Sequence, residues 1–349
     1  MALTTDYDWH EIPLDVPFTI SRGTTEVSAN AIVRIEDDAG TVGIGGATPV
    51  EYYGDTRASM DDLLPDLLAV VEDVGDPHAI QRVERRLREV AGGPREAPAA
   101  RSAVSIALHD LAAKRLDVPL YRLLGLDPAE APHSCHTVGL ADTDEMRERA
   151  VDLVDAGFDT LKLKLGTSRD VDIVSTIRAA APEATIHVDA NEAWGVAEAV
   201  EMTAILDDHD VAFVEQPVPA ADPEVLAQVA SASPVPVAAD ESCVLATDVP
   251  DVADIVDIVV VKLAKTGGIP EAVRAIHAAH AHDLDVMLGC MTESNASIAA
   301  GCHLAPLVEW VDLDGSLLLG DDPVDGVPMP GGRIELARQD RPGTGARLR

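Results

Sequence analysis

Apolar and polar side chains alternate between residues 9 and 50, which is the period of β-strands that bury one face. Residues 29–36 alternate clearly, and residues 41–45 return after a turn, so this region predicts antiparallel strands. Farther along, apolar residues recur every three or four positions, which predicts helices. The helical stretches are residues 57–74, 77–91 and 99–116. The amino-terminal part is therefore expected to form an α+β unit.

From residue 134 onward, short apolar strands alternate with stretches of helical spacing. The strands are expected to begin near residues 134, 160, 185, 211, 235, 256, 285 and 309. Seven or eight units of about 25 residues are typical of a closed parallel βα barrel. A doubly wound open sheet is the alternative, but the glycine-rich first turn of such sheets is absent from the sequence. We therefore expect an α/β fold, a (β/α)7β TIM-like barrel with an α+β capping domain.

The chain divides into three predicted segments. Residues 1–120 are the capping domain, residues 121–320 the modified TIM barrel, and residues 321–349 a tail that returns to the capping domain. Residues 333–336 of the tail are expected to pack on the amino-terminal unit.

Lysine alternates with leucine in residues 160–166, so a strand would place Lys162 and Lys164 on one face and the leucines on the other. The chain has only five lysines, and four of them fall in two close pairs, the second being Lys262 and Lys265. A buried lysine can lose its proton and act as a base, which arginine effectively never does. The two pairs are therefore predicted to serve chemistry rather than to reach solvent at strand ends.

In a βα barrel the carboxyl ends of the strands meet at one face, where catalytic groups gather. Three successive predicted strands end in acids, namely Asp189, Glu215 and Asp240. Three oxygen ligands that leave positions open for water and substrate suit Mg²⁺. One acid alone means little in a chain with 61 acidic residues, but three in succession predict a metal site.

Lys162 and Lys164 lie on the second predicted barrel strand and Lys262 on the sixth, with Lys265 just after it, so lysines flank this predicted site from opposite sides. A carboxylate substrate held by Mg²⁺ would have its α-carbon between them, and the metal would stabilise the enediolate formed when the α-proton leaves. One lysine would remove the proton and another could return one to the opposite face. Burial and neighbouring positive charge are expected to lower the lysine pKa toward the working pH.

Acidic residues spread along the whole chain give a net charge of −35, and the hydrophobic fraction of 47% excludes a disordered acidic protein. This composition predicts a halophilic protein, because a Debye length of about 3 Å at 1 M salt screens such repulsion. Nucleic acid is not an expected partner, since no basic patch exists. The cysteines lack Cys-x-x-Cys spacing, and neither a signal peptide nor a membrane-spanning apolar run is recognised. We expect a cytoplasmic protein, without membrane contact, and leave open a homo-oligomer.

The sequence resembles the enolase superfamily and, within it, the muconate-lactonising subgroup. The resemblance covers nearly the whole chain and includes residues 108–114 (Leu-His-Asp-Leu-Ala-Ala-Lys), residues 119–125 (Pro-Leu-Tyr-Arg-Leu-Leu-Gly) and the barrel motifs above. It implies that Lys164 and Lys262 are the acid/base pair and that Lys162 contacts the substrate carboxylate. It also implies that the Mg²⁺ ligands are Asp189, Glu215 and Asp240.

Residues 287–291 (Met-Leu-Gly-Cys-Met) and 311–315 (Val-Asp-Leu-Asp-Gly) are similar to those of dipeptide epimerases, especially those acting on Ala-Glu. The resemblance implies that Asp312 and Asp314 bind the free ammonium of a dipeptide and that Arg22 binds a side-chain carboxylate. The substrate-binding residues expected are Arg22, Thr137, Lys162, Cys290, Thr292, Asp312 and Asp314. Asn191 and Lys265 are expected to support the site.

Two features depart from the family pattern. Residues 45–48 (Gly-Gly-Ala-Thr) lack the glutamate that the family commonly has there, and Glu293 has no assigned role. His277, His280 and His282 are expected on a helix far from the strand ends, so they are not expected to bind metal. The leading hypothesis is a Mg²⁺-dependent epimerase of L-Ala-L-Glu-like dipeptides. The alternatives are a muconate cycloisomerase, an o-succinylbenzoate synthase or an N-acylamino-acid racemase on this scaffold, or a non-catalytic dipeptide-binding protein.

Overall fold

The computed structural model describes residues 2–338 and 341–349. The amino-terminal part is an antiparallel sheet in the order β1-β2-β3, covered by helices. Its strands are β1 (Leu3–Ile20), β2 (Gly23–Asp37) and β3 (Val42–Ala47), and its helices are α1 (Arg57–Val74), α2 (Ile80–Ala91) and α3 (Pro98–Arg115). The α+β unit is confirmed, although β1 begins well before the predicted start at residue 9.

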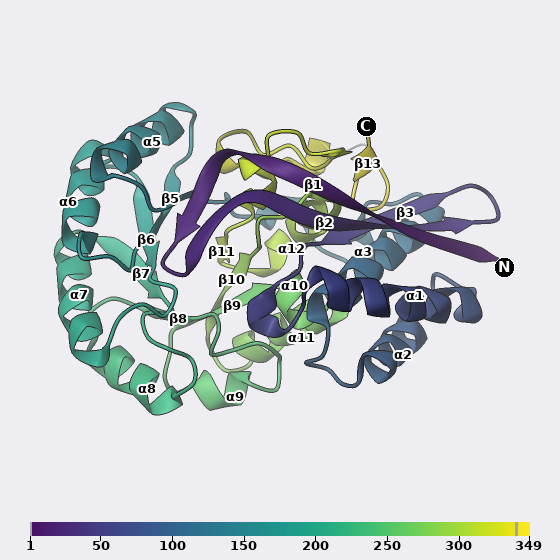
Figure 1. The fold of residues 1–349 in the computed structure, drawn as a ribbon, viewed down its shortest axis with the longest axis horizontal. Coiled ribbons are helices and arrows are strands. Elements are labelled where there is room, and N and C mark those ends of the chain that lie inside the picture. The colour runs from purple at the N-terminus through teal and green to yellow at the C-terminus, as the bar shows by residue number, and fades with distance from the viewer. Residues whose placement is uncertain (1, 339–340) are drawn as a thin grey trace.

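The second part is an eight-stranded parallel sheet in which every strand lies beside its neighbour in sequence (Figure 1). Its strands are β4 (His136–Val138), β5 (Thr160–Lys164), β6 (Thr185–Asp189), β7 (Val211–Glu215), β8 (Val237–Ala239), β9 (Ile258–Lys262), β10 (Asp285–Gly289) and β11 (Trp310–Val311). A parallel bridge between Ser134 and Val311 joins the two edges of the sheet. The predicted closed barrel is therefore confirmed.

Helices connect the successive strands and cover the outside of the sheet (Figure 1). They are α5 (Thr143–Asp155), α6 (Asp170–Ala180), α7 (Val196–Asp208), α8 (Pro223–Ala232), α9 (Val249–Val252), α10 (Leu263–Thr266), α11 (Ile269–His280) and α12 (Asn295–Leu304), with α4 (Leu120–Leu123) preceding the barrel. No helix follows β11 before the turn η4 (Asp314–Leu318), which gives the (β/α)7β order. No helix among the described residues is long and apolar enough to cross a membrane.

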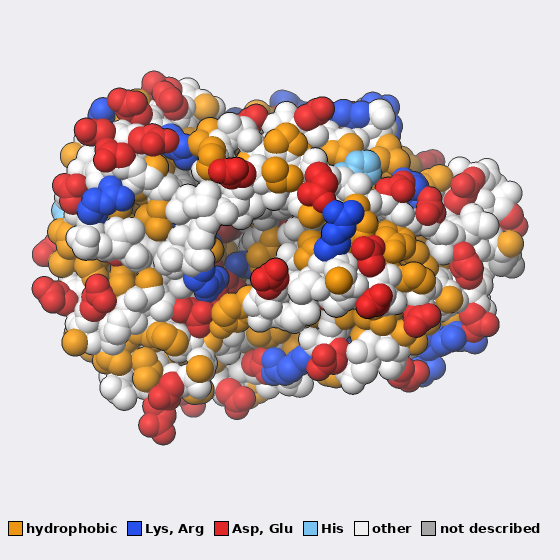
Figure 2. Space-filling view, in the orientation of Figure 1, with side chains coloured by type: hydrophobic (Ala, Val, Ile, Leu, Met, Phe, Trp, Pro, Cys, Tyr) orange, Lys and Arg blue, Asp and Glu red, His pale blue; other side chains and the backbone are white. Residues whose placement is uncertain are grey.

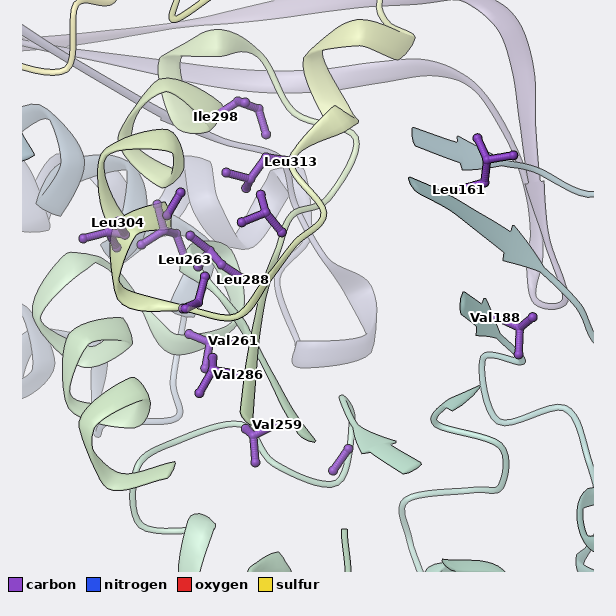
Figure 3. Close-up of a cluster of buried hydrophobic side chains, with 14 of the residues drawn as sticks. Leu161, Val188, Val259, Val261, Leu263, Val286, Leu288, Ile298, Leu304 and Leu313 are labelled. Carbon is purple, nitrogen blue, oxygen red and sulfur yellow. The ribbon is translucent and has the colours of Figure 1, made fainter. Parts of the chain in front are cut away.

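The strands bury their two faces differently, as the alternation of leucine and lysine predicts. Leu161, Val188 and Val261 point outward into a large apolar cluster beneath the helices (Figure 3). A smaller cluster around Phe213, Val260 and Met287 fills the inside of the barrel. The inward positions nearer the carboxyl ends of the strands carry the charged residues. The inner apolar cluster therefore packs directly beneath the charged site.

The capping sheet is held close to both its own helices and the barrel. A Cβ added to Gly45 would lie 2.3 Å from the carbonyl oxygen of Ala103, so the close packing of β3 on α3 requires glycine there. At the other end of the sheet, Leu14 bridges to Leu319, and Leu140 N donates to Thr19 O at 2.8 Å. These bonds hold the β1–β2 hairpin over the carboxyl ends of the barrel strands.

The tail after the barrel contacts both parts of the chain. Thr344 N and Oγ1 donate to Asp110 of α3, at 2.7 and 3.0 Å. Ile334 and Leu336 instead join the large apolar cluster that is built mostly of barrel residues. The expectation that residues 333–336 pack on the amino-terminal unit stays a prediction, while Thr344, later in the tail, bonds to α3. The division of the chain at residues 120 and 320 stays a prediction.

Candidate active site

Five neighbouring strands and the residues just after them deliver seven charged side chains to one end of the barrel. Five of the seven lie on the strands themselves, while Asp240 directly follows β8 and Lys265 lies in α10. We call this set the floor: Lys162, Lys164, Asp189, Glu215, Asp240, Lys262 and Lys265. All are buried, and each of the lysines lies within ion-pair distance of at least one carboxylate. The strand-end rule therefore brings together all three predicted ligands and both lysine pairs.

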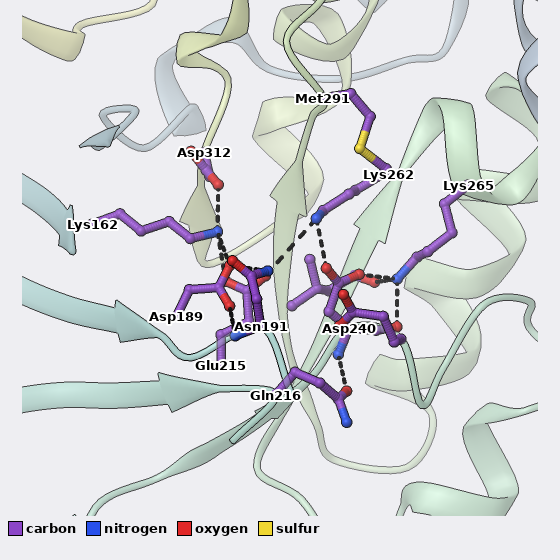
Figure 4. A network of polar contacts seen from close by, with 12 residues as sticks. Lys162, Asp189, Asn191, Glu215, Gln216, Asp240, Lys262, Lys265, Met291 and Asp312 are labelled. Atoms are coloured by element: carbon purple, nitrogen blue, oxygen red, sulfur yellow. Dashed lines mark hydrogen bonds and ion pairs between the residues drawn. The ribbon is translucent and has the colours of Figure 1, made fainter. Parts of the chain in front are cut away.

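Lys162 is almost fully buried and lies among three carboxylates (Figure 4). Its Nζ lies 2.7 Å from Glu215 Oε2, 2.8 Å from Asp312 Oδ2 and 3.3 Å from Asp189 Oδ2. Asp312, predicted to bind a substrate ammonium, is thus already paired with a cation of the protein. Three carboxylates around one ammonium group fix its position at the centre of the floor.

Lys164 and Lys262 occupy opposite sides of the floor, since β5 and β9 flank β6, β7 and β8 in the sheet. Lys164 Nζ lies 2.5 Å from Asp189 Oδ2, and Lys262 Nζ lies 2.6 Å from Asp240 Oδ2. Lys265 differs from both because its Nζ donates to three oxygens. These are Asp240 Oδ1 at 2.7 Å, Asp240 O at 2.8 Å and Val260 O at 2.6 Å. With every donor used, Lys265 is a brace for Asp240, in line with its predicted supporting place.

The pKa values correct one expectation from the sequence. Burial alone would lower the pKa of Lys262, but the charges of Asp240 and Glu215 outweigh it and raise that pKa. The pKa of Lys162 is raised for the same reason, with Asp312 as its main anionic neighbour. The sequence could not show that each lysine would pair directly with a carboxylate. Burial, together with the charge of Asp189, raises the pKa of Glu215 to about 8, although Lys162 opposes the shift.

The donor set fits a hard divalent cation. Both carboxylate oxygens of Glu215 are buried, and the cations beside them are the ammonium groups of Lys162, 2.7 Å from Oε2, and Lys262, 3.9 Å from Oε1, so this carboxylate already faces positive charge. Asp189 is held by Asn191, whose N donates at 2.8 Å and whose Nδ2 donates at 3.2 Å, so Asn191 orients one predicted ligand. As the described side chains stand, no group of three acids, histidines or cysteines encloses an ion. Lysine ammonium groups lie between the carboxylates instead.

One cavity of about 170 Å³ opens above the floor. Its walls contain Lys162, Lys164 and Lys262, the predicted supporting residue Asn191 and all the other predicted substrate contacts, namely Arg22, Thr137, Cys290, Thr292, Asp312 and Asp314. We call the upper walls the rim: Phe18, Ile20, Arg22 and Thr25 of the hairpin, with Thr292, Asp314 and Leu318. Lys265 does not line the cavity.

Two predicted substrate-binding residues on the rim, Arg22 and Asp314, already bind other groups of the protein. Arg22 pairs with Glu241 at 2.7 Å and with Glu192 at 3.0 Å, and its guanidinium lies 5.1 Å from the ring centroid of Tyr52. Asp314 Oδ2 accepts from Thr137 N at 2.6 Å. An acidic substrate side chain would therefore meet an Arg22 whose charge is already compensated.

Sequence reasoning missed three polar residues that shape the site: Glu192, Gln216 and Glu241. Gln216 Oε1 accepts from Asp240 N at 3.0 Å and from Ser242 N at 3.1 Å, which fixes the loop after β8. Asn191, Glu192 and Gln216 all have positive φ, of 46°, 66° and 35°, which is uncommon for such residues and concentrates at functional loops. The only sign of these three residues in the sequence is that each lies close to an acid at a strand end. In a chain with 61 acidic residues such closeness is weak evidence.

The structure shows that Glu293 has a structural role. It is buried, its Oε1 accepts from Met291 N at 2.9 Å, and burial raises its pKa. It therefore braces the loop that carries Cys290 and Thr292 into the cavity. His277 and His280 lie on α11, and His280 Nε2 is 3.3 Å from Glu309, away from the floor.

The fold agrees with the family comparisons. Residues 145–349 match the model described as enolase C-terminal domain-like. Residues 5–125 match the model described as the mandelate racemase / muconate lactonizing enzyme N-terminal domain. The chain belongs to the enolase superfamily, in its mandelate racemase and muconate-lactonizing branch.

Individual relatives show which members of the family the chain is similar to. The chain is 33% identical to the L-Ala-D/L-Glu epimerase of Bacteroides thetaiotaomicron, over 96% of this chain and 85% of that one. It is 36% identical to the hydrophobic dipeptide epimerase of Roseobacter litoralis, over 95% of each. The structure of an Enterococcus faecalis dipeptide epimerase, complexed with Mg and L-Leu-L-Tyr, superposes with a TM-score of 0.92 at 33% identity, covering 99% of both chains.

Proposed function

We propose that this protein is an isomerase, a Mg²⁺-dependent epimerase that inverts the α-carbon of the carboxy-terminal residue of dipeptides. The observation that carries the proposal is the placement of Lys164 and Lys262. Both line one cavity, from strands on opposite sides of the floor, so each can reach one face of an α-carbon held between them. The names of the relatives support dipeptides as the substrate class.

The position of each residue on the floor indicates its proposed role. Asp189, Glu215 and Asp240 would hold Mg²⁺, and Asn191, Gln216 and Lys265 keep these carboxylates in place through the bonds described above. Bound Mg²⁺ supplies a Lewis acid for the charge that develops on the substrate carboxylate, and it takes up carboxylate charge that here pairs with lysine. Lys162, at the centre of the floor, contacts the substrate carboxylate, while Lys164 and Lys262 exchange protons with the α-carbon.

The rim would recognise the rest of the dipeptide. Asp314, with Asp312 behind it, offers negative charge to the terminal ammonium, and charge-assisted hydrogen bonds of this kind contribute about 1.5–3 kcal/mol each. Arg22 faces the other end of the cavity but is compensated by Glu192 and Glu241. The proposed substrates therefore include dipeptides with an acidic carboxy-terminal side chain, as in L-Ala-L-Glu, and dipeptides with an apolar one.

Proton exchange in deuterated water tests the proposal. The Lys262→Ala variant should still exchange the α-proton of one epimer while failing to invert it, and Lys164→Ala should exchange only the other epimer. Mass spectrometry of each recovered dipeptide measures the incorporation of deuterium. Equal loss of exchange for both epimers in both variants would show that the two lysines do not act on separate faces. A binding protein without catalysis would exchange nothing in any variant.

The acidic surface supports work at high salt. Acidic side chains are scattered over the whole face seen in Figure 2, and they outnumber lysine and arginine in the chain by 61 to 26. At the centre of that face a hollow leads inward with basic side chains at its edge. We propose a halophilic enzyme because of its net charge of −35. We also propose a cytoplasmic location, since all four cysteines are free and three of them are buried. Small dipeptides rather than nucleic acid are its proposed partners.

A further inference from the structure

A second cavity, of about 210 Å³, adjoins the catalytic one. Its walls are mainly apolar and come from the hairpin, α5 and η4, namely Val16, Pro17, Phe18, Leu153, Leu317 and Leu318. Asp15, Arg149 and Asp152 also contribute to its lining. The space is far larger than the roughly 10–15 Å³ that one water needs, so it can take a side chain of several carbon atoms.

The two cavities share Phe18, Thr137 and Leu318. The shared wall lies beside the residues proposed to bind the substrate ammonium. Thr137 N donates to Asp314 Oδ2, and the ring of His136, which lines the second cavity, has its Nδ1 3.6 Å from the same oxygen. The second cavity therefore begins where a dipeptide bound in the catalytic cavity would place its amino-terminal residue.

Two of the apolar wall residues are unusually exposed for large hydrophobic side chains. Val16 is 45% exposed and Leu317 is 38% exposed. Exposed apolar side chains that gather at a concave site commonly mark a binding surface. Phe18 is fixed between the two cavities, because a Cβ added to Gly139 would lie 3.1 Å from its ring. The cavity wall at Phe18 is thus supported from behind rather than free to fill the space itself.

We propose that this second cavity is the subsite for the amino-terminal side chain of the substrate and that it selects a large apolar residue there, such as leucine or methionine. The proposal rests on the dipeptide epimerase function proposed above and names its substrate class. Alanine presents only a methyl group and leaves most of the cavity to water. A longer apolar side chain covers Val16, Leu153 and Leu317, and apolar burial is favourable in proportion to area. An acidic side chain would meet Asp15 and Asp152, and the one arginine of this lining, Arg149, already pairs with Glu145 at 2.7 Å.

Matched dipeptides test this subsite with the full chain and Mg²⁺ in deuterated, high-salt buffer. Glycine, alanine, leucine, methionine and aspartate are each placed before a common glutamate and, separately, before a common leucine. Leucine and methionine should exceed alanine at least about tenfold in kcat/KM, the equivalent of about 1.4 kcal/mol. Aspartate should fall below alanine. Equal values for alanine and leucine would overturn the proposal.

The variant Val16→Ser/Leu317→Ser should reduce the preference for leucine over alanine at least about fivefold, the equivalent of about 1 kcal/mol. Val27→Ser is the matched control, because Val27 is 49% exposed on the same hairpin and lines neither cavity. An unchanged preference in the double variant would contradict the subsite. If no dipeptide exchanges at all, the proposed function is wrong. Calorimetric affinities of the same peptides then still decide whether the cavity prefers a large apolar residue.

Discussion

The floor and the rim of the catalytic cavity are built on different principles. On the floor, buried lysines and carboxylates from regular strands pair with one another, and no charged side chain is more than 9% exposed. On the rim, loops and the hairpin supply partly exposed groups, such as Arg22 with 37% of its side chain exposed. The difference suggests a division of labour. Changes to the floor should reduce turnover of every substrate, whereas changes to the rim should alter the choice among substrates.

The largest effect is expected from Asp240→Asn on the floor. The substitution removes a proposed metal ligand and leaves Lys262 and Lys265 with less negative charge around them. We expect kcat to fall at least about 1,000-fold for every dipeptide, the equivalent of about 4 kcal/mol, with weaker Mg²⁺ affinity. Turnover measured during a Mg²⁺ titration checks both effects.

Two controls accompany this change. Asp142→Asn should be nearly silent, because Asp142 is exposed, lines neither cavity and caps α5, and asparagine caps equally well. Chelation with EDTA should abolish activity of the unmodified protein and added Mg²⁺ should restore it. Full activity in rigorously metal-free buffer would refute the carboxylate site.

A smaller effect is expected from Lys265→Met, which removes the brace behind Asp240 without changing the cavity wall. Turnover should fall about 10–100-fold, and equally for both epimers, as expected for a group that orients a ligand. Equality between epimers separates this positioning role from that of Lys164. The free energy of unfolding should fall by about 3–5 kcal/mol, because a buried carboxylate loses a partner.

Lys114→Met is the matched control for this loss of stability. Lys114 pairs with the buried Asp110 of α3 at 2.6 Å, in the capping part of the chain. Denaturant titration should show a loss of stability in this variant too, while the turnover per folded molecule stays close to that of the unmodified protein. A preference for one epimer in Lys265→Met would mean that Lys265 exchanges protons itself.

On the rim, N-acetylation of the substrate should cost about tenfold in kcat/KM. Acetylation removes the ammonium charge and leaves Asp314 without its proposed cation, at a cost of about 1.4 kcal/mol or more. Asp314→Asn should weaken the free dipeptide more than the acetylated one. Steady-state kinetics on Ala-Glu and N-acetyl-Ala-Glu measure the difference. If both react equally well, the ammonium site is wrong and an N-acylamino-acid racemase becomes the better hypothesis.

The smallest effect is expected from Glu192→Gln, which removes one of the two charges that compensate Arg22. The preference for Ala-Glu over Ala-Leu should rise about three- to fivefold, because partly exposed ion pairs contribute about 0.2–1 kcal/mol. The ratio of kcat/KM for the two dipeptides is the measurement. Glu183→Gln, at an exposed position on the outside of the barrel, should leave the ratio unchanged. An unchanged ratio in Glu192→Gln would show that Arg22 does not bind the carboxy-terminal side chain of the substrate.

The sequence by itself determined the regular parts of this protein. Alternation in β5 placed the leucines outside and Lys162 and Lys164 inside, and the strands at Thr160, Thr185 and Val211 begin where the pattern predicts. These features depend on local periodicity, which a strand imposes on every residue it contains. The strand-end rule then brought the three acids to one face, because all strands of a parallel barrel end on the same side.

Only the tertiary structure decided which charges pair. Lys162 meets Asp312 from a strand on the far edge of the sheet, and Arg22 meets Glu241 from the other part of the chain. These pairings raise the pKa of Lys162 and Lys262 where the sequence suggested lower values. Whether desolvation or an opposite charge dominates depends on distances of a few ångströms between residues far apart in the chain. Periodicity in the sequence carries no information about such distances.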